Sequence, residues 1–157
     1  MAGREHRYTC AVTWTGNTGS GTATYTGYSR DHTIAAAGKP VIPGSSDPAF
    51  RGDGSRYNPE DLLVASVSTC HMLWYLHMAA QAGVIVTAYR DDPVGVMVED
   101  AVKGGQFTSI KLKPTVTIAA GSDPAKARDA HAAAHAKCYV ANSLNFPVTC
   151  EPVIVGG

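Results

Sequence analysis

The strongest constraint on the fold is a long helix-forming segment that is apolar on nearly every side. Asn58 is a favourable N-cap, Pro59 suits the first helical position, and the acidic residues that follow favour the positive end of a helix dipole. Apolar side chains then recur up to a stop at Gly83 without leaving a polar stripe. Because such a helix avoids water, the sequence predicts a buried helix that begins at Pro59.

Segments on both sides of this helix alternate in the way that is typical of strands. The strands are expected at residues 8–14, 22–27, 31–37, 84–90, 94–102, 109–119 and 147–155. A second cap-plus-proline signal, Ser122-Asp123-Pro124, predicts an alanine-rich helix that continues to about Ala141. The segment 38–57 has little pattern and is longer than an ordinary connection, which is typical of a functional loop. We expect a single domain over residues 1–157.

Composition excludes several classes of partner. The apolar fraction of 45% and the charged fraction of 17% are those of an ordinary globular protein. Thirteen basic residues balance thirteen acidic ones, so no overall field draws the chain to nucleic acid or anionic lipid. We found no leader-like apolar run and no stretch of about 20 apolar residues, so we expect no membrane partner and a cytoplasmic location. Four cysteines in a reducing compartment are expected to be free, metal-bound or catalytic.

Two of the cysteines, Cys70 and Cys138, fall within the two predicted helices. A thiol attacks only as a thiolate, which needs electropositive surroundings, and a second cysteine is useful when it can resolve the oxidised first one. Two core helices could bring these sulfurs within bridging reach. Each cysteine taken alone also fits inert packing. Cys10 and Cys150, in alternating strands, fit that packing role.

Glu60 cannot touch the Cys70 thiol within one straight helix. Glu60 and Cys70 are ten residues apart, which on a straight helix is a rise of about 15 Å. If Glu60 positions a cation beside Cys70, either the helix is broken or the carboxylate belongs to another copy of the chain. If Glu60 belongs to an active site at Cys70, the chain is predicted to form a dimer. If it does not, Glu60 only interacts favourably with the helix dipole.

The cation is expected to be an arginine, because a guanidinium stays charged and forms a planar fork that a carboxylate can hold. The candidates are Arg30, Arg51 and Arg56. Arg51 leads, since it lies in the long loop just before the helix, where a mobile segment could close over a substrate. Arg30 is the second candidate for this role.

The segment from Asn58 to Cys70, with its Asn-Pro-Glu opening, resembles the signature of the OsmC and Ohr family of thiol-dependent organic hydroperoxide reductases. Residues 138–143 resemble the family's resolving-cysteine segment, although Tyr139 stands where many members have proline. Residues 50–53 look more like the OsmC branch. The resemblance spans nearly the whole chain and implies an α+β fold, with antiparallel sheets wrapped around two core helices in an intertwined homodimer.

Position by position, the resemblance implies that Cys70 is the peroxidatic cysteine, Cys138 the resolving cysteine and Glu60 the carboxylate that orients an arginine, for which we choose Arg51. The implied reaction reduces an organic hydroperoxide to an alcohol through a sulfenic acid and a Cys70–Cys138 disulfide. An external dithiol, such as a dihydrolipoyl group, would reduce that disulfide. The chemistry needs no metal, flavin or haem.

Two other classes of function stay open. His131, His135 and Cys138 share one helical face, so a metal-binding protein is an alternative, although a third ligand one turn further along a straight helix usually cannot reach the same ion. The other alternative is a noncatalytic interaction protein whose cysteines serve only packing. His71 and His77 point to different helix faces and are expected in a core or an interface.

Overall fold

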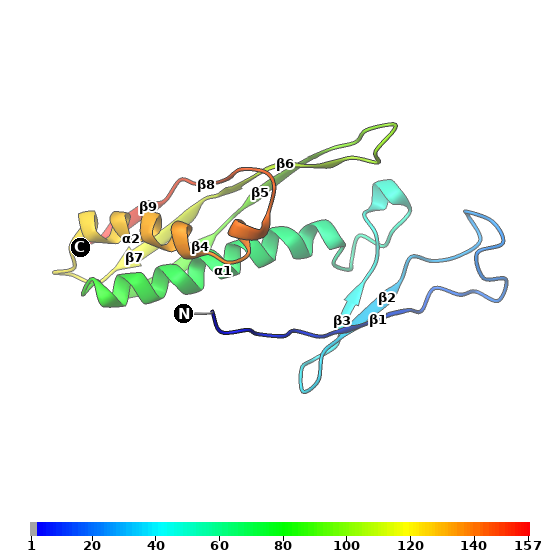
Figure 1. Ribbon diagram of the computed structural model, residues 1–157, viewed down its shortest axis with the longest axis horizontal. Helices are drawn as coiled ribbons and strands as arrows, with labels where there is room; N and C mark the ends of the chain where they lie inside the picture. Colours follow the sequence, from blue (N-terminus) through cyan, green and yellow to red (C-terminus); the bar gives the residue numbers. More distant parts are fainter. Residues whose placement is uncertain (1–2) are drawn as a thin grey trace. The chain divides into compact units, whose positions relative to one another are not determined.

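The computed structural model describes residues 3–157, so Met1 and Ala2 lie outside the described residues (Figure 1). The chain divides into two compact units, of which the first ends at Leu62 and the second comprises Leu63–Gly157. The expectation of one domain over residues 1–157 stays a prediction, and the mixed content of helices and strands confirms the α+β class.

The first unit contains a three-stranded antiparallel sheet in the order β1-β2-β3. Its strands are β1 (Ala11–Trp14), β2 (His32–Ala35) and β3 (Ile42–Gly44). The strand expected at 22–27 is wrong, because this segment forms turns. The Arg30 guanidinium donates hydrogen bonds to the carbonyls of Tyr25 and Tyr28 at 2.8 and 2.7 Å. These carbonyls are held by a side chain rather than by a neighbouring strand.

The segment 38–57 is more regular than the sequence suggested. It contains β3 and a short 3₁₀ helix, η1 (Pro48–Phe50), which Asp47 caps by accepting a hydrogen bond from the Ala49 amide. Ser45, which is fully buried, accepts a hydrogen bond from the Asp53 amide at 3.1 Å. The expected patternless loop is therefore a folded connection with its own internal hydrogen bonds.

Helix α1 (Pro59–Gln81) begins where the cap signal predicts and ends just before Gly83. Asn58 Oδ1 accepts a hydrogen bond from the Asp61 amide at 2.7 Å, and Asp61 Oδ2 accepts one from the Asn58 amide at 3.4 Å. These two reciprocal bonds form a capping box, which satisfies amides that a helix start leaves free. The predicted start of this helix is confirmed.

The second unit has two more three-stranded sheets, in the orders β4-β7-β9 and β5-β6-β8. Within each sheet one pair of strands is antiparallel and the other is parallel. The strands are β4 (Val86–Asp91), β5 (Val94–Val98), β6 (Gln106–Leu112), β7 (Pro114–Ile118), β8 (Val148–Cys150) and β9 (Val153–Gly156).

Two segments expected to be single strands are each divided in two, and the breaks fall at the same level of the sheets. Residues 109–119 are interrupted at Lys113 and residues 147–155 just after Cys150. Pro114 and Pro152 flank these breaks, and proline has no amide hydrogen to give to a ladder. The Asp91 carboxylate accepts the Lys113 amide hydrogen at 2.7 Å. The sheets therefore change course beside Asp91 and Cys150.

Helix α1 is buried along one stripe, not all round as expected. The stripe consists of Val67, His71, Tyr75 and Ala79, whereas Leu73 is 64% exposed in the single chain. The same helix is long and apolar enough to cross a bilayer, with a mean hydropathy of 1.3 over 18 residues, which corrects the expectation that no segment reaches that length. A core helix of a globular protein has the same length and composition, and this stripe packs into two apolar cores.

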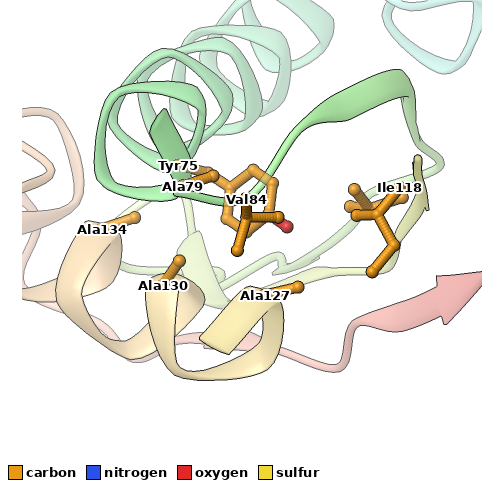
Figure 2. Packing of buried hydrophobic residues seen from close by; sticks show 8 residues of the cluster. Tyr75, Ala79, Val84, Ile118, Ala127, Ala130 and Ala134 are labelled. Atoms are coloured by element: carbon orange, nitrogen blue, oxygen red, sulfur yellow. The ribbon is translucent and has the colours of Figure 1, made fainter. Parts of the chain in front are cut away.

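The second helix, α2 (Pro124–Lys137), packs its alanine face against α1 (Figure 2). Ala127, Ala130 and Ala134 are buried against Tyr75 and Ala79. Because alanine has the smallest side chain that still favours a helix, this face of α2 leaves room for the large Tyr75 side chain of α1.

The α2 helix ends at Lys137, earlier than the expected Ala141. Cys138 is its C-cap, with an extended ψ of 103°, and a short 3₁₀ helix, η2 (Ala141–Ser143), follows. The extended cap residue turns the chain away from the axis of α2, so residues 138–143 do not continue its helical register.

The alanine contact can be tested by overpacking. Ala134→Leu adds three carbon atoms at a site with no exposed surface, so we expect it to lower the free energy of unfolding by about 1–3 kcal/mol. Ala133→Leu is the matched control, because Ala133 is exposed on the neighbouring face, and its effect should stay within about 0.5 kcal/mol. Urea denaturation of both variants provides the measurement, and equal effects would contradict the packing described here.

Candidate active site

The structure brings Cys70 and Cys138 together. Cys70 lies in the middle of α1 and is half-buried, and Cys138 at the end of α2 is fully buried. The Cys70 thiol is close enough to raise the pKa of the Cys138 thiol. Both thiols are free. The two sulfurs are therefore neighbours that are not joined by a disulfide.

The two thiols differ in their environment. The pKa of Cys138 is raised to about 11, mainly by burial and to a smaller extent by the Cys70 side chain, while the backbone amides of Ala141 and Val140 act in the opposite direction. Cys138 is therefore a neutral thiol at physiological pH. Cys70 has the greater access to solvent. The pair is asymmetric, with one accessible sulfur and one that is buried and protonated.

An aromatic contact holds the same two segments together. Trp74, one turn after Cys70 on α1, packs edge-to-face against Tyr139 with ring centroids 5.6 Å apart. The Lys137 ammonium lies 5.7 Å from the centre of the Trp74 ring. A small cavity of about 290 Å³ beside them is lined by Leu73, Trp74 and His77. Tyr139 thus contributes an aromatic contact next to the thiol pair.

Glu60 lies at the second position of α1 and is half-buried. Among the described residues of a single chain, it forms no ion pair with an arginine. The implied contact between Glu60 and Arg51 is therefore not formed within the first unit, and the role of Glu60 stays a prediction.

The three candidate arginines are held differently within the first unit. Arg30 stacks on the rings of Tyr25 and Tyr28 while bonding their carbonyls. Arg56 is paired with Asp31 and Asp53. Of the three, only Arg51 is neither paired with a carboxylate nor bonded through its side chain to a carbonyl in the described part of the chain.

Arg51 also has an unusual backbone. Its φ of 66° is left-handed, and among the described residues other than glycine it is alone in this, a conformation that is uncommon for a residue with a Cβ atom. The next residue, Gly52, passes so close to Ser46 that a Cβ would lie 1.5 Å from the Ser46 carbonyl oxygen. The neighbouring backbone therefore fixes the position of Arg51, in contrast to the mobile segment expected there.

Histidines gather at a place the sequence did not indicate. His71 Nε2 and His131 Nδ1 are 3.1 Å apart, and Cys150 Sγ lies 3.5 Å from the first and 3.9 Å from the second. The alternative metal site of His131, His135 and Cys138 is not assembled, because His135 is exposed and Cys138 leaves the register of α2. Helical spacing on α1 placed His71 on the core stripe, but no sequence signal joined it to Cys150.

Burial keeps both of these imidazoles neutral. The pKa of His71 is lowered to about 4, mainly by burial and to a smaller extent by the charge of His135. The pKa of His131 is lowered to about 3, mainly by burial and to a smaller extent by the charge of His71. Tyr75 stacks on the His131 ring with centroids 3.8 Å apart. The pair is thus held in an apolar, aromatic setting.

Comparisons with known proteins give a consistent result. The family model described as OsmC-like protein matches residues 52–152. An OsmC-like protein of unknown function from Vibrio cholerae O1 biovar eltor is 30% identical, with a TM-score of 0.86 over 95% of this chain and 100% of that one. No curated protein matches the sequence.

More distant solved structures share the fold. An organic hydroperoxide resistance protein from Elizabethkingia anophelis is 16% identical, with a TM-score of 0.68 over 98% of this chain and 100% of that one. An organic hydroperoxide resistance protein OsmC from Legionella pneumophila is 17% identical, with a TM-score of 0.67 over 96% and 99%. The expected OsmC/Ohr-like fold is confirmed, and the homodimer stays a prediction. The expectation of purely antiparallel sheets is wrong for the second unit, where β6 pairs with β8 and β7 with β9 in parallel.

The buried state of Cys138 can be tested by alkylation. A pKa raised from 9.0 to about 11 lowers the thiolate fraction at pH 8 about 100-fold. We expect iodoacetamide to label Cys138 at least that much more slowly than the exposed Cys10, which mass spectrometry of timed digests would measure. Labelling of both residues at one rate in the folded protein would contradict this environment, and urea-unfolded protein provides the control.

Proposed function

The chain belongs to the OsmC-like protein family, and from this premise we propose that it is a thiol peroxidase that reduces organic hydroperoxides. The observation that carries the proposal is the pairing of a half-buried Cys70 with a buried, protonated Cys138. A thiol that meets the peroxide first needs access, and a resolving thiol needs only to meet the oxidised partner.

The proposed reaction begins with Cys70 as a thiolate. Its sulfur attacks one oxygen of the hydroperoxide, the O–O bond breaks, and the alkoxide takes a proton and leaves as an alcohol. Cys70 is then a sulfenic acid. The Cys138 thiol attacks this sulfur, and the departing hydroxide combines with the thiol proton to form water. The resulting disulfide is reduced by an external dithiol through exchange.

An arginine is needed to stabilise the thiolate and polarise the peroxide, and we assign this role to Arg51. Its guanidinium lies over the Tyr25 ring, but within the described chain it is bonded to no carboxylate or carbonyl. Arg30 bonds two carbonyls, and Arg56 pairs with two carboxylates. Glu60, which also lacks an arginine partner within the described chain, would hold that guanidinium. Both groups are free to meet across an interface between two copies.

A homodimer would also cover the exposed side of α1. Leu73 is 64% exposed and Leu76 36% exposed, although both belong to a helix with few polar positions. Burying such side chains stabilises an association by about 25 cal/mol per Å² before the costs of ordering are subtracted. A second copy of the chain is the partner we propose for this face.

The substrate and the reductant follow from the surroundings of the thiols. Apolar side chains near Cys70, including Leu73 and Trp74 around the small cavity, favour a hydroperoxide with an alkyl or aryl group over hydrogen peroxide. A dihydrolipoyl group is the proposed dithiol. The proposed location is the cytoplasm, where a reducing environment keeps exposed thiols such as Cys10 free.

Cysteine replacements test the roles. With cumene hydroperoxide and a dithiol, Cys70→Ser should reduce turnover to the uncatalysed background, because the attacking sulfur is lost. Cys138→Ser should consume one equivalent of peroxide and then stop, because it forms no internal disulfide. The dithiol for this assay is one that reduces only disulfides. Peroxide consumption in single-turnover and steady-state assays measures both.

Peptide mapping provides the companion measurement. One equivalent of cumene hydroperoxide should remove two thiols from the wild-type protein and link Cys70 to Cys138, while Cys10→Ser serves as the control with unchanged activity. Wild-type protein that keeps all its thiols, or two cysteine variants that both cycle normally, would refute the peroxidase assignment.

Replacing the arginines separates Arg51 from Arg30. We expect Arg51→Ala to lower kcat/KM for cumene hydroperoxide by about 100-fold or more, the usual loss when one donor to a developing charge is removed. Arg30→Ala, which removes the contacts with Tyr25 and Tyr28, should change stability more than kcat/KM. The opposite ranking would transfer the role to Arg30.

Subunit mixing then tests whether the site is shared. A heterodimer of Arg51→Ala and Cys70→Ser chains contains one complete site only if Cys70 of one copy meets Arg51 of the other. Co-expressed chains with two different tags should regain up to half of the wild-type activity after tandem purification. Continued inactivity of a purified heterodimer, or a monomer in light scattering, would overturn the shared site.

A further inference from the structure

We propose that the second unit binds a zinc ion between His71, His131 and Cys150. The three side chains come from α1, α2 and β8, so residues distant in the sequence converge at one point. His71 and His131 are 1% and 4% exposed, and Cys150 is half-buried. This site goes beyond the proposed peroxidase chemistry, which uses neither the histidines nor Cys150.

The distances match those between zinc ligands. With zinc bonds of 2.0–2.1 Å to nitrogen and 2.3 Å to sulfur, two ligands at the tetrahedral angle lie about 3.3 Å apart for two nitrogens and about 3.6 Å for nitrogen and sulfur. The observed separations are 3.1 Å between the nitrogens and 3.5 and 3.9 Å to the sulfur. The two rings are nearly parallel, with centroids 5.4 Å apart, so their facing nitrogens point at each other. One ion can bind all three atoms once the imidazole rings rotate to turn both nitrogens toward it.

A hydrogen-bond network explains this convergence less completely. One proton between His71 Nε2 and His131 Nδ1 accounts for the 3.1 Å contact. It leaves the sulfur with two longer contacts, and sulfur hydrogen bonds are weak. A metal ion would bind all three atoms at once. Two imidazoles and one thiolate are ligands that zinc prefers.

A nearby carboxylate can balance the charge of a bound zinc ion. Asp91 is close enough to act electrostatically on both His71 and Cys150, and it is fixed by hydrogen bonds from Ser68 and from the Lys113 amide. With one thiolate, this carboxylate brings the local negative charge to that of a divalent cation.

A cavity of about 440 Å³ has Cys150 and His131 in its wall, together with Thr149 and His135. Because Cys150 and His131 line this cavity, water from it can reach two of the three proposed ligands. Three protein ligands with one open position are typical of zinc sites that exchange a ligand rather than of closed structural sites. The inferred site is therefore accessible to a small anion or to water.

Metal titration tests the inference. Protein purified without an affinity tag, stripped of metal and kept reduced, is titrated with zinc chloride against a chromophoric chelator. We expect about one ion per chain. Cys150→Ser should bind at least about 100-fold more weakly, because loss of even an outer-shell partner costs 10–100-fold. Cys10→Ser is the control that should bind like the wild type.

Cobalt binding tests the same site in a variant that keeps Cys150, so the test does not depend on the folding of Cys150→Ser. The triple variant Cys10→Ser/Cys70→Ser/Cys138→Ser keeps Cys150 as the single thiol and has no peroxidase activity. With cobalt chloride it should show the visible bands of a tetrahedral ion and a near-ultraviolet thiolate band. The site would be overturned if these bands were absent, or if the wild-type chain bound less than about a tenth of a zinc ion. It would also be overturned if Cys138→Ser alone removed the thiolate band.

Discussion

The core that the buried stripe of α1 shares with the alanine face of α2 determines where both side-chain clusters form. Ala127, Ala130 and Ala134 share one buried cluster with Tyr75 and Ala79, and their small side chains leave room for the Tyr75 ring (Figure 2). The approach that buries these apolar atoms also stacks Tyr75 on His131. Because interiors are close-packed, a change in this contact would shift the sulfur and nitrogen atoms relative to one another.

One helix serves two separate clusters because consecutive residues point in different directions. Cys70 and His71 are neighbours in the chain, and successive side chains on a helix diverge by about 100°. Cys70 therefore meets Cys138 at the end of α2, whereas His71 meets His131 and Cys150. The redox proposal and the zinc proposal use different thiols, and each can fail without the other.

Elements with strong local signals were predictable from the sequence. Asn58 and Asp123 cap the two helices as expected, since a capping side chain acts on amides two or three residues away. The division of strands at Lys113 and after Cys150 was not predicted, because alternation continues across these breaks. The turns at 22–27 were also missed, since the carbonyls of Tyr25 and Tyr28 are held by the Arg30 side chain.

The sequence by itself determined the family and the start of α1 and indicated the two cysteines that lie close together, because local capping, periodicity and a linked motif carry that information. Only the tertiary structure decided that Cys150 lies beside His71 and His131, and that Cys138 is a buried C-cap. Seventy-nine residues separate His71 from Cys150. Contacts over such distances depend on how strands and helices pack, which no local pattern encodes.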